Sequence, residues 1–239
     1  MHHEHIVIAE RFRGPPRSGN GGYVCGLVAR PLHGTVAVRL KAPPPLDREL
    51  RLASTEKHAR LLDGNELLAE AKVVQLDLQP PARPSFEEAQ VATRSFLGFR
   101  KHPFPGCFVC GVERPPLDGL RIFPGPTDTA SQLAAPWMPD HTVVDESGKV
   151  KPEFLWAALD CPGAFVVMPL LQGLTVVLGE LCASIVGDVR AQERCVVTAW
   201  PLGGEGRKRL AGSAVYGDDG RLVAIARAVW IEVPASSWG

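Results

Sequence analysis

The sequence predicts an α+β protein in which one arrangement occurs twice, a buried helix followed by antiparallel strands. Each half contains a segment that is apolar on nearly every side, at 22–30 and at 152–160, which is typical of a buried helix. Each half closes with an Asp-Gly turn followed by apolar and alternating residues, at 63–76 and 219–231, which is typical of a hairpin that enters a long strand. A stretch rich in Pro and Gly, at 79–129, separates the halves.

The first half is expected to contain one helix and then strands. Asn20 is placed to cap the helix at 22–30, because an Asn side chain accepts hydrogen bonds from backbone N–H groups of the first turn. Alternating residues at 35–40 predict a strand, which the prolines at 43–45 end before a second strand at 49–54.

The second half is expected to repeat this order. Pro152 suits the first turn of the helix at 152–160, because backbone N–H groups in that turn have no acceptor within the helix and proline lacks this group. Strands are predicted at 175–185 and 195–200, and the connection is expected to contain a short helix at 86–96. The expected division is an N-terminal half at 1–78, a connection at 79–129 and a C-terminal half at 130–239.

Composition excludes several classes of protein. The 239 residues include 26 Lys and Arg and 26 Asp and Glu, and the resulting net charge of zero argues against a nucleic-acid binder. No apolar stretch reaches 18 residues, so no membrane span is expected. Six cysteines in a chain of this length do not form the disulfide framework of a small secreted domain. With no visible secretory signal, we expect a cytoplasmic protein with reduced thiols.

The order of elements resembles the hotdog fold, in which a curved antiparallel sheet wraps a long central helix. With two copies in one chain, the sequence is similar to the double-hotdog acyl-CoA thioesterases of the acyl-CoA thioesterase II-like kind. The resemblance is carried by 20–23, 39–47, 156–160 and the two Asp-Gly units. It implies two curved sheets, each around a helix, and a role in lipid metabolism as a hydrolase of acyl-CoA or a related thioester that needs no cofactor.

The resemblance also implies site residues. Asp160 matches the Asp that activates water in this family, and Ser184 matches the helper hydroxyl on the following strand. The helper Gln of the last strand falls near Ala228, which cannot do that work. A non-catalytic module that binds acyl-CoA or lipid therefore stays open as the alternative.

The residues themselves carry two interpretations of this region. Asp160 ends an apolar segment, and burial would raise its pKa and suit it to general-base chemistry; otherwise it is a helix-ending Asp that bonds to Gly163. Asn20, Gly21 and Gly22 would leave N–H groups that polarise a thioester carbonyl, or they form an ordinary capped turn. The residues expected to border the acyl tunnel are Tyr23, Leu27, Phe154 and Trp156.

The CFVCG run at 107–111 is the sharpest local motif. Cys107 and Cys110 could supply half of a tetrahedral zinc site, with His102 as a third ligand. No second CxxC or HxxxH follows and no fourth ligand is evident, so a structural turn is favoured and no metal is expected. The remaining cysteines considered, which fall in predicted core elements, are Cys161, Cys182 and Cys195.

A basic turn at Arg207, Lys208 and Arg209 follows a glycine-rich stretch and could hold the phosphates of coenzyme A, although most such turns are simply exposed. The sequence has no GxSxG elbow and no phosphate-binding glycine loop. Phe165 stands five residues after Asp160, where the related hydratases carry His. Edge strands leave pairing with a second copy of the chain open.

Overall fold

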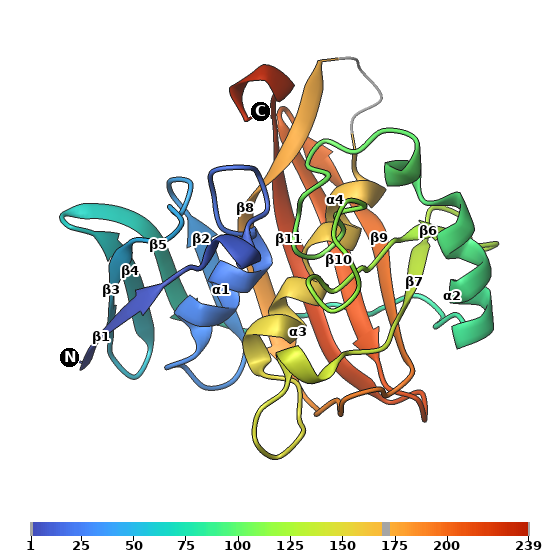
Figure 1. Ribbon diagram of the computed structural model, residues 1–239, viewed down its shortest axis with the longest axis horizontal. Coiled ribbons are helices and arrows are strands. Elements are labelled where there is room, and N and C mark those ends of the chain that lie inside the picture. The colour runs from blue at the N-terminus through green and yellow to red at the C-terminus, as the bar shows by residue number, and fades with distance from the viewer. Residues whose placement is uncertain (1, 169–172, 239) are drawn as a thin grey trace.

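The protein forms one antiparallel sheet of eleven strands, with helices packed against one of its faces (Figure 1). The computed structural model describes residues 2–168 and 173–238. The strands lie in the order β1-β3-β4-β5-β2-β8-β11-β10-β9-β7-β6, in which the first five belong to the N-terminal half, the next five to the C-terminal half, and β6 to the end of the connection. In the part of the chain that is described, no helix is long and apolar enough to cross a membrane.

The N-terminal half contains the predicted helix and strands. The Asn20 side chain accepts a hydrogen bond of 3.0 Å from the Tyr23 amide, which confirms it as the cap of the first helix. Gly64 has a φ of +57° in the Asp-Gly turn between two strands, a conformation that favours glycine. The elements are β1 (His2–Val7), α1 (Gly21–Ala29), β2 (Val36–Leu40), β3 (Glu49–Ser54), β4 (His58–Asp63) and β5 (Glu66–Val73).

The C-terminal half contributes the long strands. The predicted strand at 195–200 is longer than expected and reaches Glu205, where a hairpin begins. The elements of this half are β7 (Leu133–Trp137), α3 (Pro152–Ala158), α4 (Cys161–Val166), β8 (Leu174–Ile185), β9 (Cys195–Glu205), β10 (Lys208–Tyr216) and β11 (Leu222–Pro234), and the short strand β6 (Gly125–Pro126) precedes them at the end of the connection.

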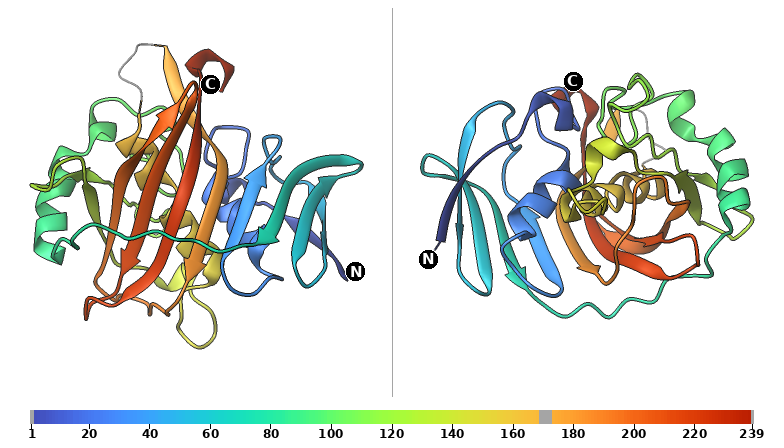
Figure 2. Two further views of the ribbon diagram at one scale, coloured as in Figure 1. Left: turned by 180° about the vertical axis from the view of Figure 1, so that it is seen from behind. Right: turned by 60° about the horizontal axis from the view of Figure 1, so that its bottom comes forward.

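The connection crosses the face of the sheet opposite the helices. It runs from β5 across the long strands, as the left view of Figure 2 shows. Leu76 and Leu78 pack there against a small apolar cluster that includes Trp200 and Tyr216. The connection then forms α2 (Phe86–Ala92), whose cap Ser85 makes a capping box with Glu88.

The expectation of two separate sheets is wrong, because β2 and β8 pair with each other. Their register runs from Val36 opposite Ala183 to Arg39 opposite Glu180, and the last two form an ion pair of 2.7 Å between Nη2 and Oε2. An open strand edge exposes unpaired N–H and C=O groups, and this pairing satisfies them. The two halves therefore share one continuous sheet.

The helix expected at 152–160 is present as α3, which ends at Ala158, and a second short helix follows after a break at Asp160. Pro162 has no N–H to donate to the carbonyl of Ala158, where α3 ends. Asp160 has φ −79° and ψ −80° at the break, and α4 begins at the next residue. The hydroxyl of Ser213 donates a hydrogen bond of 2.7 Å to the carbonyl of Leu159, which stabilises the break.

The helices α1 and α3 approach each other at two glycines. A Cβ atom on Gly22 would lie 2.5 Å from the Cβ of Asp160, and one on Gly26 would lie 2.5 Å from the Cα of Glu153. Only glycine permits such contact between two backbones. This packing brings the start of α1 directly against the break before α4, where the candidate site lies.

Candidate functional site

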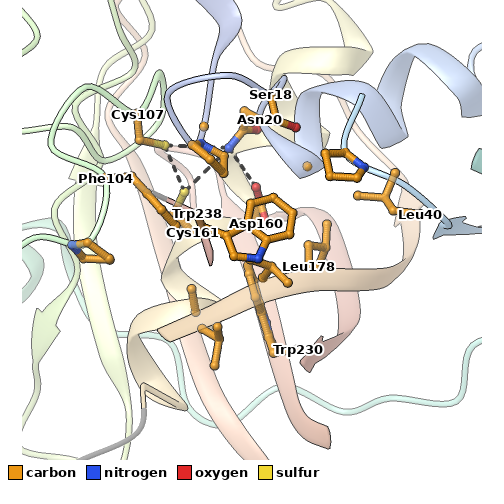
Figure 3. Close-up of a pocket in the computed structure, with 18 of the residues that line it drawn as sticks. Ser18, Asn20, Leu40, Phe104, Cys107, Asp160, Cys161, Leu178, Trp230 and Trp238 are labelled. Carbon is orange, nitrogen blue, oxygen red and sulfur yellow. Dashed lines mark hydrogen bonds between the residues drawn. The ribbon is translucent and has the colours of Figure 1, made fainter. Parts of the chain in front are cut away.

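A cavity of about 230 Å³ opens where the two halves meet, beside the first turns of α1 and α4 (Figure 3). Apolar side chains form most of its wall. Its lining comes from 14–15, 18–21, 40–44, 102–104, Cys107, Cys110, 160–161, 164–165, Met168, 176–179, 230–231 and Trp238. A concave apolar site with a few polar groups is the usual form of a small-molecule binding site.

Asp160 is the buried carboxylate of this cavity. One of its oxygens, Oδ2, accepts hydrogen bonds of 2.8 Å from the side-chain amide of Asn20 and 2.9 Å from the backbone amide of Gly22. The other oxygen, Oδ1, is buried and has no hydrogen-bond partner among the described residues. Asp160 is therefore held by one oxygen while the other stays free.

Burial raises the pKa of Asp160 to about 7. The loss of hydration disfavours the charged carboxylate, and the bond from the Gly22 amide opposes this effect only in part. The nearby Cys107 raises the pKa further, and the Asn20 amide lowers it. A carboxylate with a raised pKa is a stronger base than an ordinary Asp. It is therefore better suited to take a proton from water.

The glycine amides divide between two tasks. The Gly22 amide donates to Asp160, so the expectation that it would hold a substrate oxyanion is wrong. Gly21 lines the cavity in the first turn of α1, where N–H groups have no acceptor within the helix. Asn20 lines the cavity too, and its side-chain NH2 group donates to the carboxylate of Asp160.

The structure does not bring Tyr23 and Trp156 to the cavity. Tyr23 stacks on Phe12 with 4.3 Å between ring centroids, and Trp156 is buried in the main core. Leu27 and Phe154 lie in the same core. The helices α1 and α3 use their apolar faces to pack on each other and on the sheet, so strand residues and α4 line the cavity instead.

The strands reach the cavity at positions that differ from those expected. β8 lines it at 176–179, whereas Ser184 lies near the far end of that strand, opposite Ile225. Ala228 is buried and pairs with Leu181, while β11 lines the cavity at Trp230 and its neighbour Ile231. The indole Nε1 of Trp230 is buried without a partner among the described residues, which leaves one hydrogen-bond donor at this wall.

The predicted basic turn lies beside the cavity end of β11. Lys208 is opposite Ile231, which lines the cavity, and the Arg207 carbonyl accepts a hydrogen bond from the Glu232 amide. Arg209 forms an ion pair of 2.8 Å with Glu232, while Arg207 and Lys208 are exposed. Two exposed positive charges therefore lie near one end of the site.

Three cysteines converge next to Asp160. The sulfur atoms of Cys107, Cys110 and Cys161 all lie within 4.8 Å of one another, and those of Cys107 and Cys161 are 3.6 Å apart. Cys161 was expected in the core, and its contact with Cys107 was not predicted, because the two residues lie 54 positions apart in the sequence. The available signal was the Cys-Pro pair that follows Asp160 at a helix break.

His102 is not a member of this cluster. Its Nε2 donates a hydrogen bond of 3.0 Å to the Cys110 carbonyl, and its Nδ1 accepts one of 3.0 Å from the Phe104 amide. Both ring nitrogens are therefore occupied, and the suggestion of His102 as a ligand is wrong.

Solved structures share this fold over nearly the whole chain. A putative thioesterase II from Thermobifida fusca matches 96% of this chain and 93% of its own, with a TM-score of 0.60 and 13% identity. A tesB protein from Mycobacterium avium subsp. paratuberculosis matches 90% of this chain and 88% of its own, with a TM-score of 0.57 and 14% identity. These matches confirm the predicted resemblance in fold to double-hotdog thioesterase II structures.

A shorter match, with a TM-score of 0.40 and 12% identity, is a hypothetical thioesterase from Streptococcus pneumoniae crystallised with coenzyme A. It covers 43% of this chain and 82% of its own. No protein-family model matches the sequence, and no curated protein matches it.

Proposed function

We propose that this protein hydrolyses an acyl thioester, with Asp160 as the general base. The observation that carries the proposal is the free, buried Oδ1 of Asp160 at a cavity with apolar walls. Two hydrogen bonds to Oδ2 fix the carboxylate, so that Oδ1 is oriented before a substrate enters. The likeness in fold to thioesterase II structures supports the same reaction.

In this reaction Oδ1 takes a proton from water while the water oxygen attacks the thioester carbonyl carbon. The tetrahedral intermediate then breaks its C–S bond, and the leaving thiolate takes the proton from Asp160, which gives a carboxylic acid and a thiol. The negative charge on the carbonyl oxygen needs hydrogen-bond donors. The Gly21 amide and the Trp230 indole N–H are the candidates, since both residues line the cavity.

Coenzyme A is the proposed thiol carrier because of the basic turn. Arg207 and Lys208 are exposed beside the cavity end of β11, where they could bind phosphate groups. Replacing both with Ala should raise KM for an acyl-CoA and leave KM unchanged for an acyl thioester of N-acetylcysteamine, which has no phosphate. An equal effect on both substrates would contradict this assignment.

A second candidate function is binding of acyl-CoA without hydrolysis. It is favoured by Ala228 at the position expected for the helper Gln and by the distance of Ser184 from the cavity-lining part of β8. If the protein is an enzyme, Gly21 and Trp230 must supply the hydrogen bonds that the missing helper groups would otherwise provide.

Thiol release from acyl-CoAs of rising chain length separates these functions. We expect hydrolysis with a chain-length optimum, and Asp160→Asn should lower kcat about 10²–10⁴-fold without weakening binding. Glu153→Gln is the matched control, because it alters a buried carboxylate of α3 that does not line the cavity. Full turnover by Asp160→Asn would refute the mechanism. Saturable binding without turnover by the unmodified protein would establish the binding module.

A further inference from the structure

The three cysteines beside the cavity have the spacing of metal ligands. Tetrahedral zinc with Zn–S bonds of about 2.3 Å places its sulfur ligands about 3.8 Å apart. The sulfurs of Cys107 and Cys161 are 3.6 Å apart, and that of Cys110 lies within 4.8 Å of both. A single ion between the three sulfurs would bond to all of them after small side-chain adjustments.

The turn at 107–111 is built to present two of these sulfurs. The Gly111 amide donates a hydrogen bond of 2.9 Å to the Cys107 carbonyl, and a Cβ on Gly111 would lie 2.4 Å from that oxygen. Only glycine closes the turn this tightly.

The third sulfur comes from the helix break. Cys161 opens α4 directly after Asp160, so the break in the helix sets the position of both side chains. The Asn20 amide nitrogen lies 3.8 Å from the Cys107 sulfur and 3.7 Å from the Cys161 sulfur, and it donates to Asp160 as well (Figure 3). One amide thus links the sulfur cluster to the buried carboxylate.

We propose that Cys107, Cys110 and Cys161 bind a zinc ion whose fourth ligand is water from the cavity. Thiolate ligands select zinc over magnesium or calcium. All three cysteines line the cavity, and a zinc site with three protein ligands keeps its fourth position open. His102 is the nearest protein candidate for the fourth ligand in the sequence, but both of its ring nitrogens form hydrogen bonds with the backbone of Cys110 and Phe104.

Zinc content of the full chain, purified under reducing conditions, tests this proposal without any substrate. We expect about one zinc per chain by mass spectrometry of the elements. Each of the substitutions Cys107→Ser, Cys110→Ser and Cys161→Ser should reduce the zinc content strongly. Cys182→Ser and Cys195→Ser are matched controls, since these cysteines are also buried but do not line the cavity, and they should keep the zinc.

Cobalt substitution gives a second readout that does not depend on how the variants fold. Unmodified protein stripped of metal and loaded with Co²⁺ should show the thiolate-to-cobalt absorption bands of a site with three sulfur ligands, and equimolar Zn²⁺ should remove them. The proposal is overturned if the purified protein holds no zinc and the stripped protein gives no such bands. A disulfide between Cys107 and Cys161 in the purified, metal-free protein would also overturn the proposal, if treatment with a reducing agent and zinc does not yield the zinc-bound form.

These readouts are independent of the proposed hydrolysis. A protein that binds zinc but releases no thiol from any acyl-CoA would support the metal site and refute the enzyme. Hydrolysis by a protein that binds no zinc would refute the metal site alone.

Discussion

The side-chain amide of Asn20 donates a hydrogen bond of 2.8 Å to the carboxylate of Asp160, which lies 140 residues later in the chain. The same Asn20 caps α1 through its carbonyl oxygen, which accepts from the Tyr23 amide. One side chain therefore fixes the first helix of the N-terminal half and orients the carboxylate of the C-terminal half. The candidate site exists only where the two halves meet.

Asn20→Ser separates these two tasks. Serine caps a helix about as well as Asn, so the cap itself should be kept, and the lost hydrogen bond to buried Asp160 should cost about 1–3 kcal/mol in the free energy of unfolding. Serine cannot place an amide donor on Oδ2 of Asp160, and misplacement of a catalytic group by about 1 Å can cost about 10²-fold in rate. We expect kcat for acyl-CoA hydrolysis to fall by that order, as measured by thiol release.

The control for this variant is Ser85→Ala, which removes the cap of α2 outside the cavity. It should cost about 1 kcal/mol of stability and leave kcat unchanged. If Asn20→Ser keeps its full kcat, Asn20 has a structural role only and does not orient Asp160 for the reaction.

Gly22→Ala tests the close contact of α1 with the helix break. The new Cβ would lie 2.5 Å from the Cβ of Asp160 and 2.6 Å from the carbonyl oxygen of Trp156. Neither a backbone oxygen nor a buried side-chain stem can move away cheaply, so we expect a loss of about 1–3 kcal/mol of stability in urea unfolding.

Gly187→Ala is the matched control for Gly22→Ala. The nearest atom to a Cβ on Gly187 would be 3.6 Å away, which is ordinary contact. It should change stability by less than about 1 kcal/mol. Equal stability of the two variants would show that α1 and α3 are not packed as closely as described.

Ser213→Ala tests the bond that stabilises the break before Asp160. Ser213 is buried, and its loss would leave the Leu159 carbonyl without its 2.7 Å hydrogen bond. A buried carbonyl without a partner costs about 1–3 kcal/mol, which urea unfolding would measure.

Ser184→Ala is the companion variant, because Ser184 is half-buried and lies away from the cavity-lining part of β8. We expect it to change stability by about 0.5 kcal/mol or less and to keep full activity. Loss of activity in a folded Ser184→Ala protein would instead identify Ser184 as the helper hydroxyl that the family resemblance implies.

Local signals in the sequence predicted the features that depend on neighbouring residues. Asn20 was predicted as a cap and Pro152 as a first-turn residue because capping and helix initiation are decided within a few positions. The helix end at Asp160 was predicted in the same way, because the apolar segment stops there, but the short helix α4 that follows was not expected.

Features that depend on distant residues were not predicted. Pairing of β2 with β8 brings Val36 against Ala183, and no local pattern encodes which strand edges meet. Tyr23 and Trp156 were assigned to the acyl tunnel because helices that are apolar on every side give no sign of which face meets a cavity. The contact of Cys161 with Cys107 and Cys110 is visible only in the folded structure.

Leu40→Trp should shorten the acyl chain that the protein prefers. Leu40 ends β2, is half-buried and lines the cavity, so a larger side chain there would occupy space that the substrate needs. Each methylene that no longer fits in an apolar pocket costs about 1–3 kcal/mol, or about 10–200-fold in kcat/KM. We therefore expect kcat/KM to fall by at least about tenfold for the longest good substrate and little for the shortest. Leu202→Trp, at a half-buried leucine that packs against the Trp200 cluster outside the cavity, should leave the chain-length profile unchanged. A uniform fall of kcat/KM across all chain lengths in Leu40→Trp would place the acyl chain elsewhere in the protein.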